Sequence, residues 1–175
     1  MNKSENNLLI AASGTGGHIF PALTIADEIN DYWKITWLGI KSRCEVDLVP
    51  AKYSLLTLDF KTPSKKNIFL IIQYLKIIFA TFKVVKIINQ RKISLILTTG
   101  GYISAPVIIA AKISNIPVIL HESNLMPGLV TKYFGRFCDL VLTGFKETNQ
   151  YLRQCRISFT GTPLRKQFYN SNQLP

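Results

Sequence analysis

Short apolar runs alternate along the chain with longer segments whose apolar residues recur at helical spacing. The short runs predict strands at residues 7–12, 34–40, 54–60, 94–99, 117–121, 140–144 and 157–160. The longer segments predict helices at residues 19–31, 43–50, 67–91, 103–114, 127–136 and 146–153. Strands that are apolar at consecutive positions and joined by helices form mainly parallel sheets covered on both faces. The pattern predicts an α/β fold with a Rossmann-like, doubly wound sheet.

The first strand leads into a glycine-rich turn at residues 14–21, which read Gly-Thr-Gly-Gly-His-Ile-Phe-Pro. Glycine lets backbone N–H groups approach a ligand closely, and the N-terminus of the following helix adds partial positive charge. A phosphate or diphosphate therefore suits this turn. His18 is the side chain here that can exchange a proton near neutral pH. Because glycine turns between a strand and a helix are common, a purely structural role stays open at this point.

Three further clusters of special residues also follow predicted strands. They lie at residues 100–102 (Gly-Gly-Tyr), 121–124 (His-Glu-Ser-Asn) and 161–163 (Gly-Thr-Pro). In a parallel sheet, loops that follow strands emerge at the carboxyl edge, where open α/β folds bind ligands. The sequence therefore predicts one site at that edge.

The net charge of the chain indicates what kind of molecule it binds. Lys and Arg outnumber Asp and Glu by 21 to 10, which gives a net charge of +11 and indicates an anionic partner. Three widely spaced cysteines provide neither a disulfide nor a zinc framework and favour a reducing cytosol. The first apolar run is too short for a secretory signal, so we expect no export.

The segment 67–91 is the most apolar helix and also carries much of the charge. Gln73, Lys76, Lys83 and Gln90 form one thin polar stripe on it. No acidic residue occurs between residues 61 and 92, where eight basic residues fall: Lys61, Lys65, Lys66, Lys76, Lys83, Lys86, Arg91 and Lys92.

Three interpretations of this helix compete. A transmembrane span would place two lysines in the bilayer at about 2.5–3.5 kcal/mol each. A core helix with solvated lysines is the plain alternative. We favour peripheral attachment to an anionic membrane surface, because each lysine near such a surface adds about 1 kcal/mol; the contacts would be Lys65, Lys66, Lys76, Phe79 and Lys83. Nucleic acid is disfavoured, because the basic residues interleave with aliphatic ones and no nucleic-acid motif is present.

The whole of residues 14–21 is more specific than its glycines and resembles the opening of the MurG family of glycosyltransferases. Four further stretches match that family in order. They are Trp37-Leu38-Gly39 with the segment 45–50, the Gly-Gly-Tyr loop at 100–102, the segment 117–129 around His121-Glu122-Ser123-Asn124, and residues 161–165 (Gly-Thr-Pro-Leu-Arg).

The resemblance implies an inverting GT-B enzyme, with two Rossmann-like domains facing a cleft, at the cytoplasmic face of the bacterial plasma membrane. It implies transfer of GlcNAc from UDP-GlcNAc to the C4 hydroxyl of the MurNAc sugar in undecaprenyl-diphosphate-linked lipid I, which forms lipid II. The chain contains no Asp-x-Asp motif. We therefore expect neither a metal nor a cofactor. A non-catalytic subunit that binds membrane and lipid diphosphate is the alternative function.

The resemblance also suggests residue roles. It makes His18 the candidate base, with Glu122 orienting it or holding the acceptor, although a buried carboxylate capping a loop fits Glu122 equally well. Residues implied in UDP-GlcNAc binding are Thr15, Gly16, Gly17, Asn124 and Arg165, although Asn124 could instead cap the next helix. Residues implied in binding the acceptor diphosphate are Gly14, Gly100, Gly101 and Tyr102, although a packing role fits Tyr102 equally well.

The chain departs from the family in three ways. Ser123 stands where the family usually has Gln, and Thr162 where it has Asn, so two polar side chains are shorter. We expect residues 1–161 to form the acceptor domain and 162–175 a hinge toward a donor domain beyond this sequence. Either the sequence is truncated or a separate chain supplies the donor half. Alone, this half should transfer little or no sugar.

Overall fold

The computed structural model describes residues 6–41, 45–59 and 69–165, and Lys65 and Lys66 lie outside these ranges. Its centre is a seven-stranded sheet in the order β3-β2-β1-β4-β5-β6-β7. Every neighbouring pair is parallel. The strands are β1 (Asn7–Ala11), β2 (Lys34–Ile40), β3 (Ser54–Leu58), β4 (Leu95–Thr98), β5 (Val118–Glu122), β6 (Leu140–Thr143) and β7 (Ile157–Phe159). The sequence-based prediction of the strands and of a Rossmann-like sheet is confirmed.

Helices occupy most of the predicted positions, with differences in type and length. The helices are α1 (Gly16–Ile29), α2 (Glu45–Leu48), α3 (Phe69–Arg91), α4 (Ser104–Ile113) and α5 (Leu129–Phe134), with 3-10 helices η1 (Gly135–Phe137) and η2 (Lys146–Tyr151). The helix expected at 146–153 is a 3-10 helix over Lys146–Tyr151 and not an α-helix. Its Thr148 and Asn149 side chains hydrogen-bond to residues outside the helix, and such competition disfavours a regular α-helix.

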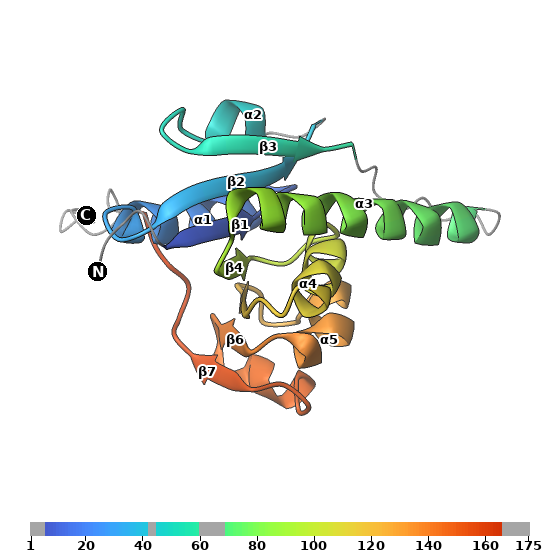
Figure 1. Ribbon diagram of the computed structural model, residues 1–175. Helices are drawn as coiled ribbons and strands as arrows, with labels where there is room; N and C mark the ends of the chain where they lie inside the picture. The colour runs from blue at the N-terminus through green and yellow to red at the C-terminus, as the bar shows by residue number, and fades with distance from the viewer. Residues whose placement is uncertain (1–5, 42–44, 60–68, 166–175) are drawn as a thin grey trace.

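Alternate residues of the central strand face two separate cores. Leu9 and Ala11 join the core beneath α3 and α4, whereas Leu8 and Ile10 join the core beneath α1. Figure 1 shows α3 and α4 on one side of the sheet and α1 on the other. Both faces of β1 are therefore covered, as expected for a buried parallel strand.

Helix α3 buries only one side. Ala80, Val84 and Ile88, spaced by four, pack into the core, while Phe79 and Phe82 are each 67% exposed. In Figure 1 its N-terminal end extends beyond the rest of the described chain. Within the described ranges, no helix is both long and apolar enough to cross a bilayer.

Candidate active site at the carboxyl edge of the sheet

His18 lies on the first turn of α1, beside the loop that follows β4. Its Nδ1 is 2.6 Å from the carbonyl oxygen of Thr99, and the Thr99 hydroxyl donates to the carbonyl of His18 at 2.8 Å. Two hydrogen bonds therefore tie the turns after β1 and β4 together. These strands are neighbours at the point where the strand order reverses, which is where open α/β sheets bind ligands.

The contact with Thr99 fixes which nitrogen of His18 can take up a proton. A carbonyl oxygen only accepts hydrogen bonds, so Nδ1 carries the hydrogen and donates it. In the neutral imidazole, Nε2 then holds the lone pair. His18 is half-buried, and its ring lies against the backbone of the Gly100–Gly101 turn. The geometry leaves Nε2 as the atom able to act as a base.

Both glycine turns need glycine for their backbone conformation, and Gly100 is needed also for the space beside His18. Gly14, Gly100 and Gly101 have φ of 110°, 88° and 76°, which side-chain-bearing residues rarely adopt. A Cβ on Gly100 would also lie 3.4 Å from Cε1 of His18, so glycine leaves room for the imidazole. The turns thus bring the backbone close to His18.

The N-terminus of α1 is open to a ligand. Thr15 precedes the helix and makes no side-chain cap hydrogen bond. The first N–H groups of a helix have no carbonyl oxygen within the helix to bond to. Here the Thr15 side chain does not act as the acceptor in its place. Gly16 and Gly17 begin the helix, and Thr15 and Gly17 are exposed. This end can bind an anionic group through its backbone.

Glu122 is buried, and its carboxyl group is occupied by its own loop. One oxygen accepts from the backbone N–H of Asn124 at 3.0 Å and its side-chain amide at 2.7 Å. The other accepts from the N–H of Gly128 at 3.0 Å and the hydroxyl of Thr131 at 2.6 Å. Of the two roles left open by the sequence, these contacts are those of loop capping. Gly100 lies between His18 and Thr131.

The remaining predicted residues lie around this edge. The Asn124 amide bonds to Glu122, and the cap position before α5 is Gly128, so Asn124 does not cap that helix. Tyr102 is 43% exposed on the loop after β4. The Arg165 guanidinium stacks on the ring of Phe20 in α1, 4.3 Å from its centroid.

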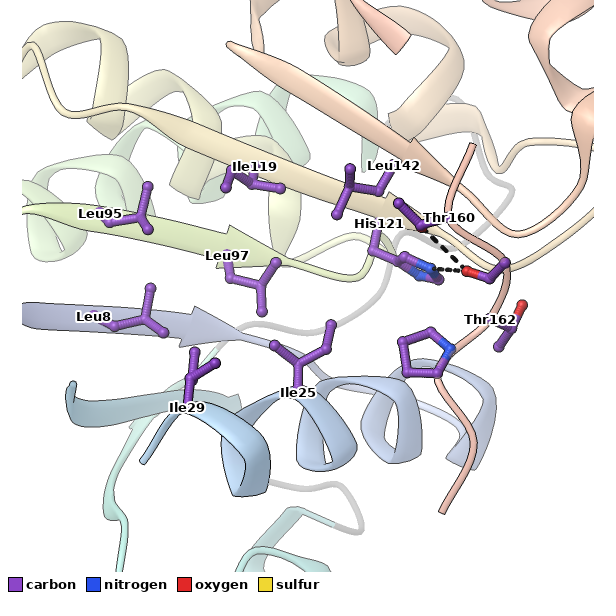
Figure 2. Close-up of a pocket in the computed structure, with 12 residues that line it drawn as sticks. Leu8, Ile25, Ile29, Leu95, Leu97, Ile119, His121, Leu142, Thr160 and Thr162 are labelled. Carbon is purple, nitrogen blue, oxygen red and sulfur yellow. Dashed lines mark hydrogen bonds between the residues drawn. The ribbon is translucent and has the colours of Figure 1, made fainter. Parts of the chain in front are cut away.

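His121 contacts the segment that leaves the sheet, residues 160–163. Its Nε2 donates to the carbonyl of Gly161 at 3.0 Å (Figure 2). The hydroxyl of Ser123 lies 3.2 Å from Nδ1. Burial lowers the pKa of His121, against the opposing effects of the Gly161 bond and the charge of Glu122. Beside it, a cavity of about 380 Å³ opens between the sheet, α1 and residues 160–163, lined mainly by Leu8, Ile25, Leu97, Ile119 and Leu142. Both nitrogens of His121 are occupied.

Three residues near the site were not predicted. Thr99 positions His18, Thr131 donates to Glu122 and lies near the Gly100 turn, and Ser13 precedes Gly14. The Ser13 hydroxyl is buried and has no hydrogen-bond partner among the described residues. The position of Ser13 directly before the glycines was a signal in the sequence that could have identified it. No such signal marked Thr131.

The parallel sheet and its glycine turns define a Rossmann-like domain of the glycosyltransferase type. The sequence matches the Glycosyltransferase family 28 N-terminal domain over residues 8–143, and the chain belongs to that family.

Curated relatives share most of the residues. The chain is 60% identical over 175 residues to a protein of Prochlorococcus marinus strain MIT 9515, covering all of this chain and 48% of the relative. It is 62% identical over 175 residues to the counterpart from strain MED4, with the same coverage. Both are named UDP-N-acetylglucosamine–N-acetylmuramyl-(pentapeptide) pyrophosphoryl-undecaprenol N-acetylglucosamine transferase, the MurG enzyme. The chain thus spans about half the length of these relatives.

Solved structures share the fold. MurG of Acinetobacter baumannii superposes with a TM-score of 0.78 at 24% identity, covering 97% of this chain and 50% of the other. The UDP-GlcNAc 2-epimerase of Neisseria meningitidis, solved with UDP-GlcNAc, gives 0.63 at 14% identity, covering 89% and 46%. At these identities the likeness establishes the fold alone.

Proposed function

We propose that the chain is the acceptor-binding half of an enzyme that transfers GlcNAc from UDP-GlcNAc to the MurNAc C4 hydroxyl of lipid I, producing lipid II. The names of relatives up to 62% identical support the reaction. The single structural observation that carries the proposal is the pairing of His18 Nδ1 with the Thr99 carbonyl, which leaves Nε2 as a base beside two glycine turns.

Inversion at the anomeric carbon needs one direct displacement. The acceptor oxygen attacks as UDP departs, and a base removes the hydroxyl proton. We assign that proton to Nε2 of His18. When Nε2 takes the proton, the Thr99 carbonyl still accepts from Nδ1 and stabilises the resulting cation.

The substrates are assigned to two groups of backbone donors and side chains. The acceptor diphosphate lies against Gly14, Gly100 and Gly101, with Tyr102 at the rim. The donor nucleotide-sugar is reached by the open N-terminus of α1 and, farther out, by Asn124 and Arg165. Because Glu122 is engaged by its loop, we assign it to positioning that loop instead of proton transfer.

The exposed side of α3 is proposed as the docking face on an anionic membrane. Leu75, Ile78, Phe79 and Phe82 are between 48% and 67% exposed on it. Lys76, Lys83 and Lys86 are exposed beside them, with Asp59 on the edge of the hollow that Lys76 and Lys83 line. Apolar side chains ringed by lysines suit the boundary between headgroups and acyl chains. On this basis we propose that the enzyme attaches peripherally to the plasma membrane, at its cytoplasmic face.

Reconstitution tests the reaction. The chain is mixed with the C-terminal half of the Prochlorococcus relative, UDP-GlcNAc and lipid I, and lipid II is measured. We expect transfer with both halves present and little with either alone. Tyr32→Ala, at an exposed position after α1, is the matched control and should be as active as the wild type.

The second candidate is a lipid-diphosphate-binding subunit without catalysis. The occupied carboxyl group of Glu122 favours it, because it leaves His18 as the sole titratable side chain assigned to the reaction. Binding of lipid I without any transfer, in the presence of a donor half that is active with a relative's own N-terminal half, would establish this candidate and refute the transferase proposal.

A further inference from the structure

Exposed large apolar side chains gather in two places on the described chain. Four lie on α3, in the docking face already described. Five others fall between residues 125 and 137, which we call the α5 strip: Leu125, Met126, Leu129, Tyr133 and Phe137. A cluster of this kind on a water-exposed surface marks a contact site.

The apolar side chains of α5 in the strip lie on one side of the helix, and basic side chains lie beside them. Leu129 and Tyr133 are spaced by four along α5, so they lie on one side of it, and they are 62% and 63% exposed. Phe137 follows in η1. Lys132 and Arg136 line the neighbouring hollow, and the Arg136 guanidinium lies 4.8 Å from the centroid of the Phe137 ring. No acidic residue occurs in the sequence between Glu122 and Asp139.

The tip of the strip is held outward by buried hydrogen bonds. The Glu122 carboxyl group binds both ends of the loop, at Asn124 and Gly128. The Thr148 hydroxyl contacts the carbonyls of Asn124 and Leu125 at 3.1 and 3.0 Å. Between these anchors Met126 is 69% exposed. A fixed loop presents its apolar side chains without further ordering on binding, which lowers the cost of the contact.

The strip and the docking face lie on the same side of the sheet. Helix α4 packs against α3 and against α5, so the three helices adjoin (Figure 1). The loop 122–129 follows β5 at the carboxyl edge, and Phe79 of α3 lies by Leu58 at the end of β3, at that same edge. The two apolar surfaces therefore flank the edge that carries His18.

We propose that the α5 strip is a second membrane contact, whose tip at Leu125 and Met126 enters the apolar boundary of a lipid bilayer while Lys132 and Arg136 face the headgroups. The inference rests on the proposed membrane docking of α3. It adds the α5 strip to the docking face on α3, so that the domain contacts the membrane along two lines. Two lines fix the tilt of the domain, so that the carboxyl edge faces the membrane. Apolar insertion is not screened by salt, unlike contacts made by lysines.

Vesicle binding by the whole chain tests this inference. The variants are Leu125→Ser/Met126→Ser, Lys76→Gln/Lys83→Gln and the control Tyr32→Ser, an equally exposed aromatic after α1. Binding is measured on phosphatidylcholine vesicles with and without phosphatidylglycerol, at low and high salt. We expect the serine pair to weaken binding about tenfold at both salt concentrations. The glutamine pair should remove only the salt-sensitive part.

The outcomes separate this inference from the docking of α3. Equal binding by the serine pair and by Tyr32→Ser, with loss in the glutamine pair, would overturn the strip and leave α3 docking intact. Absence of vesicle binding by the wild type would overturn both. Thermal unfolding of each variant checks the fold, which exposed side chains should not alter.

A direct depth measurement uses Met126→Trp. Its emission should shift to shorter wavelength on vesicles and be quenched by brominated lipid, whereas the natural Trp33 and Trp37 lie in the α1–β2 region. An unquenched signal at position 126 would overturn the inference. Protection of this position by the C-terminal half, and not by vesicles, would assign the strip to the other half and overturn it too.

Discussion

The two histidines at the carboxyl edge occupy opposite kinds of surroundings. His18 uses one nitrogen to bond the Thr99 carbonyl and lies half-buried against glycine backbone. His121 is buried, uses both nitrogens on Gly161 and Ser123, and has its pKa lowered by burial. The same side chain therefore keeps one ring nitrogen available in the first place, and in the second it holds the chain segment that leaves the sheet.

The contrast extends to the residues around each histidine. Next to His18 are the open N-terminus of α1 and the hydroxyl of Ser13, which has no partner within the part of the chain that the structure describes. Next to His121, the carboxyl group of Glu122 accepts four hydrogen bonds. A group can bind substrate only through hydrogen-bonding capacity that the fold has not already used. By this criterion the site is centred on His18, and the segment 121–128 is its support.

Replacing Glu122 should have the largest effect on stability. Glu122→Ala removes the acceptor of the buried Thr131 hydroxyl and of the part-buried N–H groups of Asn124 and Gly128. We expect unfolding free energy to fall by about 3–5 kcal/mol, measured by urea denaturation. The exposed Glu28→Ala is the control and should change stability little. A stable Glu122→Ala protein that binds lipid I normally but transfers nothing would instead make Glu122 catalytic.

Replacing His18 should affect transfer and leave stability nearly unchanged. His18→Asn keeps an N–H donor for the Thr99 carbonyl and removes the base. We expect transfer in the reconstituted enzyme to fall about 10²-fold or more, with unfolding free energy altered by less than about 1 kcal/mol. Wild-type activity in this variant would exclude His18 as the base.

Gly100 and Gly161 provide a matched pair of left-handed glycines. Their φ values are 88° and 75°, but a Cβ would approach His18 only at Gly100 and has open space at Gly161. Alanine at either position should cost about 1–2 kcal/mol, measured by denaturation. Only Gly100→Ala should move the NMR signal of His18 Cε1–H. An equal shift in both variants would show that the Gly100 turn does not set the position of the imidazole.

The smallest expected effect is the pH dependence due to His121. Its folded pKa is lowered, so the unfolded chain binds more protons as the pH falls below the ordinary value near 6.5. The stability from neutral His121 is therefore complete above about pH 7 and is lost on acidification, by at most about 1.4 kcal/mol per pH unit. Denaturation of wild type and His121→Gln between pH 5 and 8 measures the difference. Identical pH profiles would contradict the assignment.

The sequence predicted the strands well and the hydrogen-bond partners poorly, and the place of the site stays a prediction. Consecutive apolar residues identify buried parallel strands, and glycines after β1 and β4 point to the carboxyl edge. Thr99 and Thr131 could not be predicted, because a carbonyl acceptor or a hydroxyl that spans two loops depends on backbone geometry. The same limit left Glu122 between two roles until its four donors were seen. In α3, the sequence analysis named Phe79 as a surface contact but not Phe82, which is equally exposed.

The strand order also bears on how this domain is synthesised. β1 pairs with β2 on one side and with β4 on the other, and Leu8 lies opposite Leu95. A ribosome must therefore release most of the first hundred residues before the central strand gains its second neighbour. Until then one edge of β1, with its apolar side chains, is open to other chains. The glycine turn that follows β1 meets its partner loop only after this step, so the candidate site is completed late in folding.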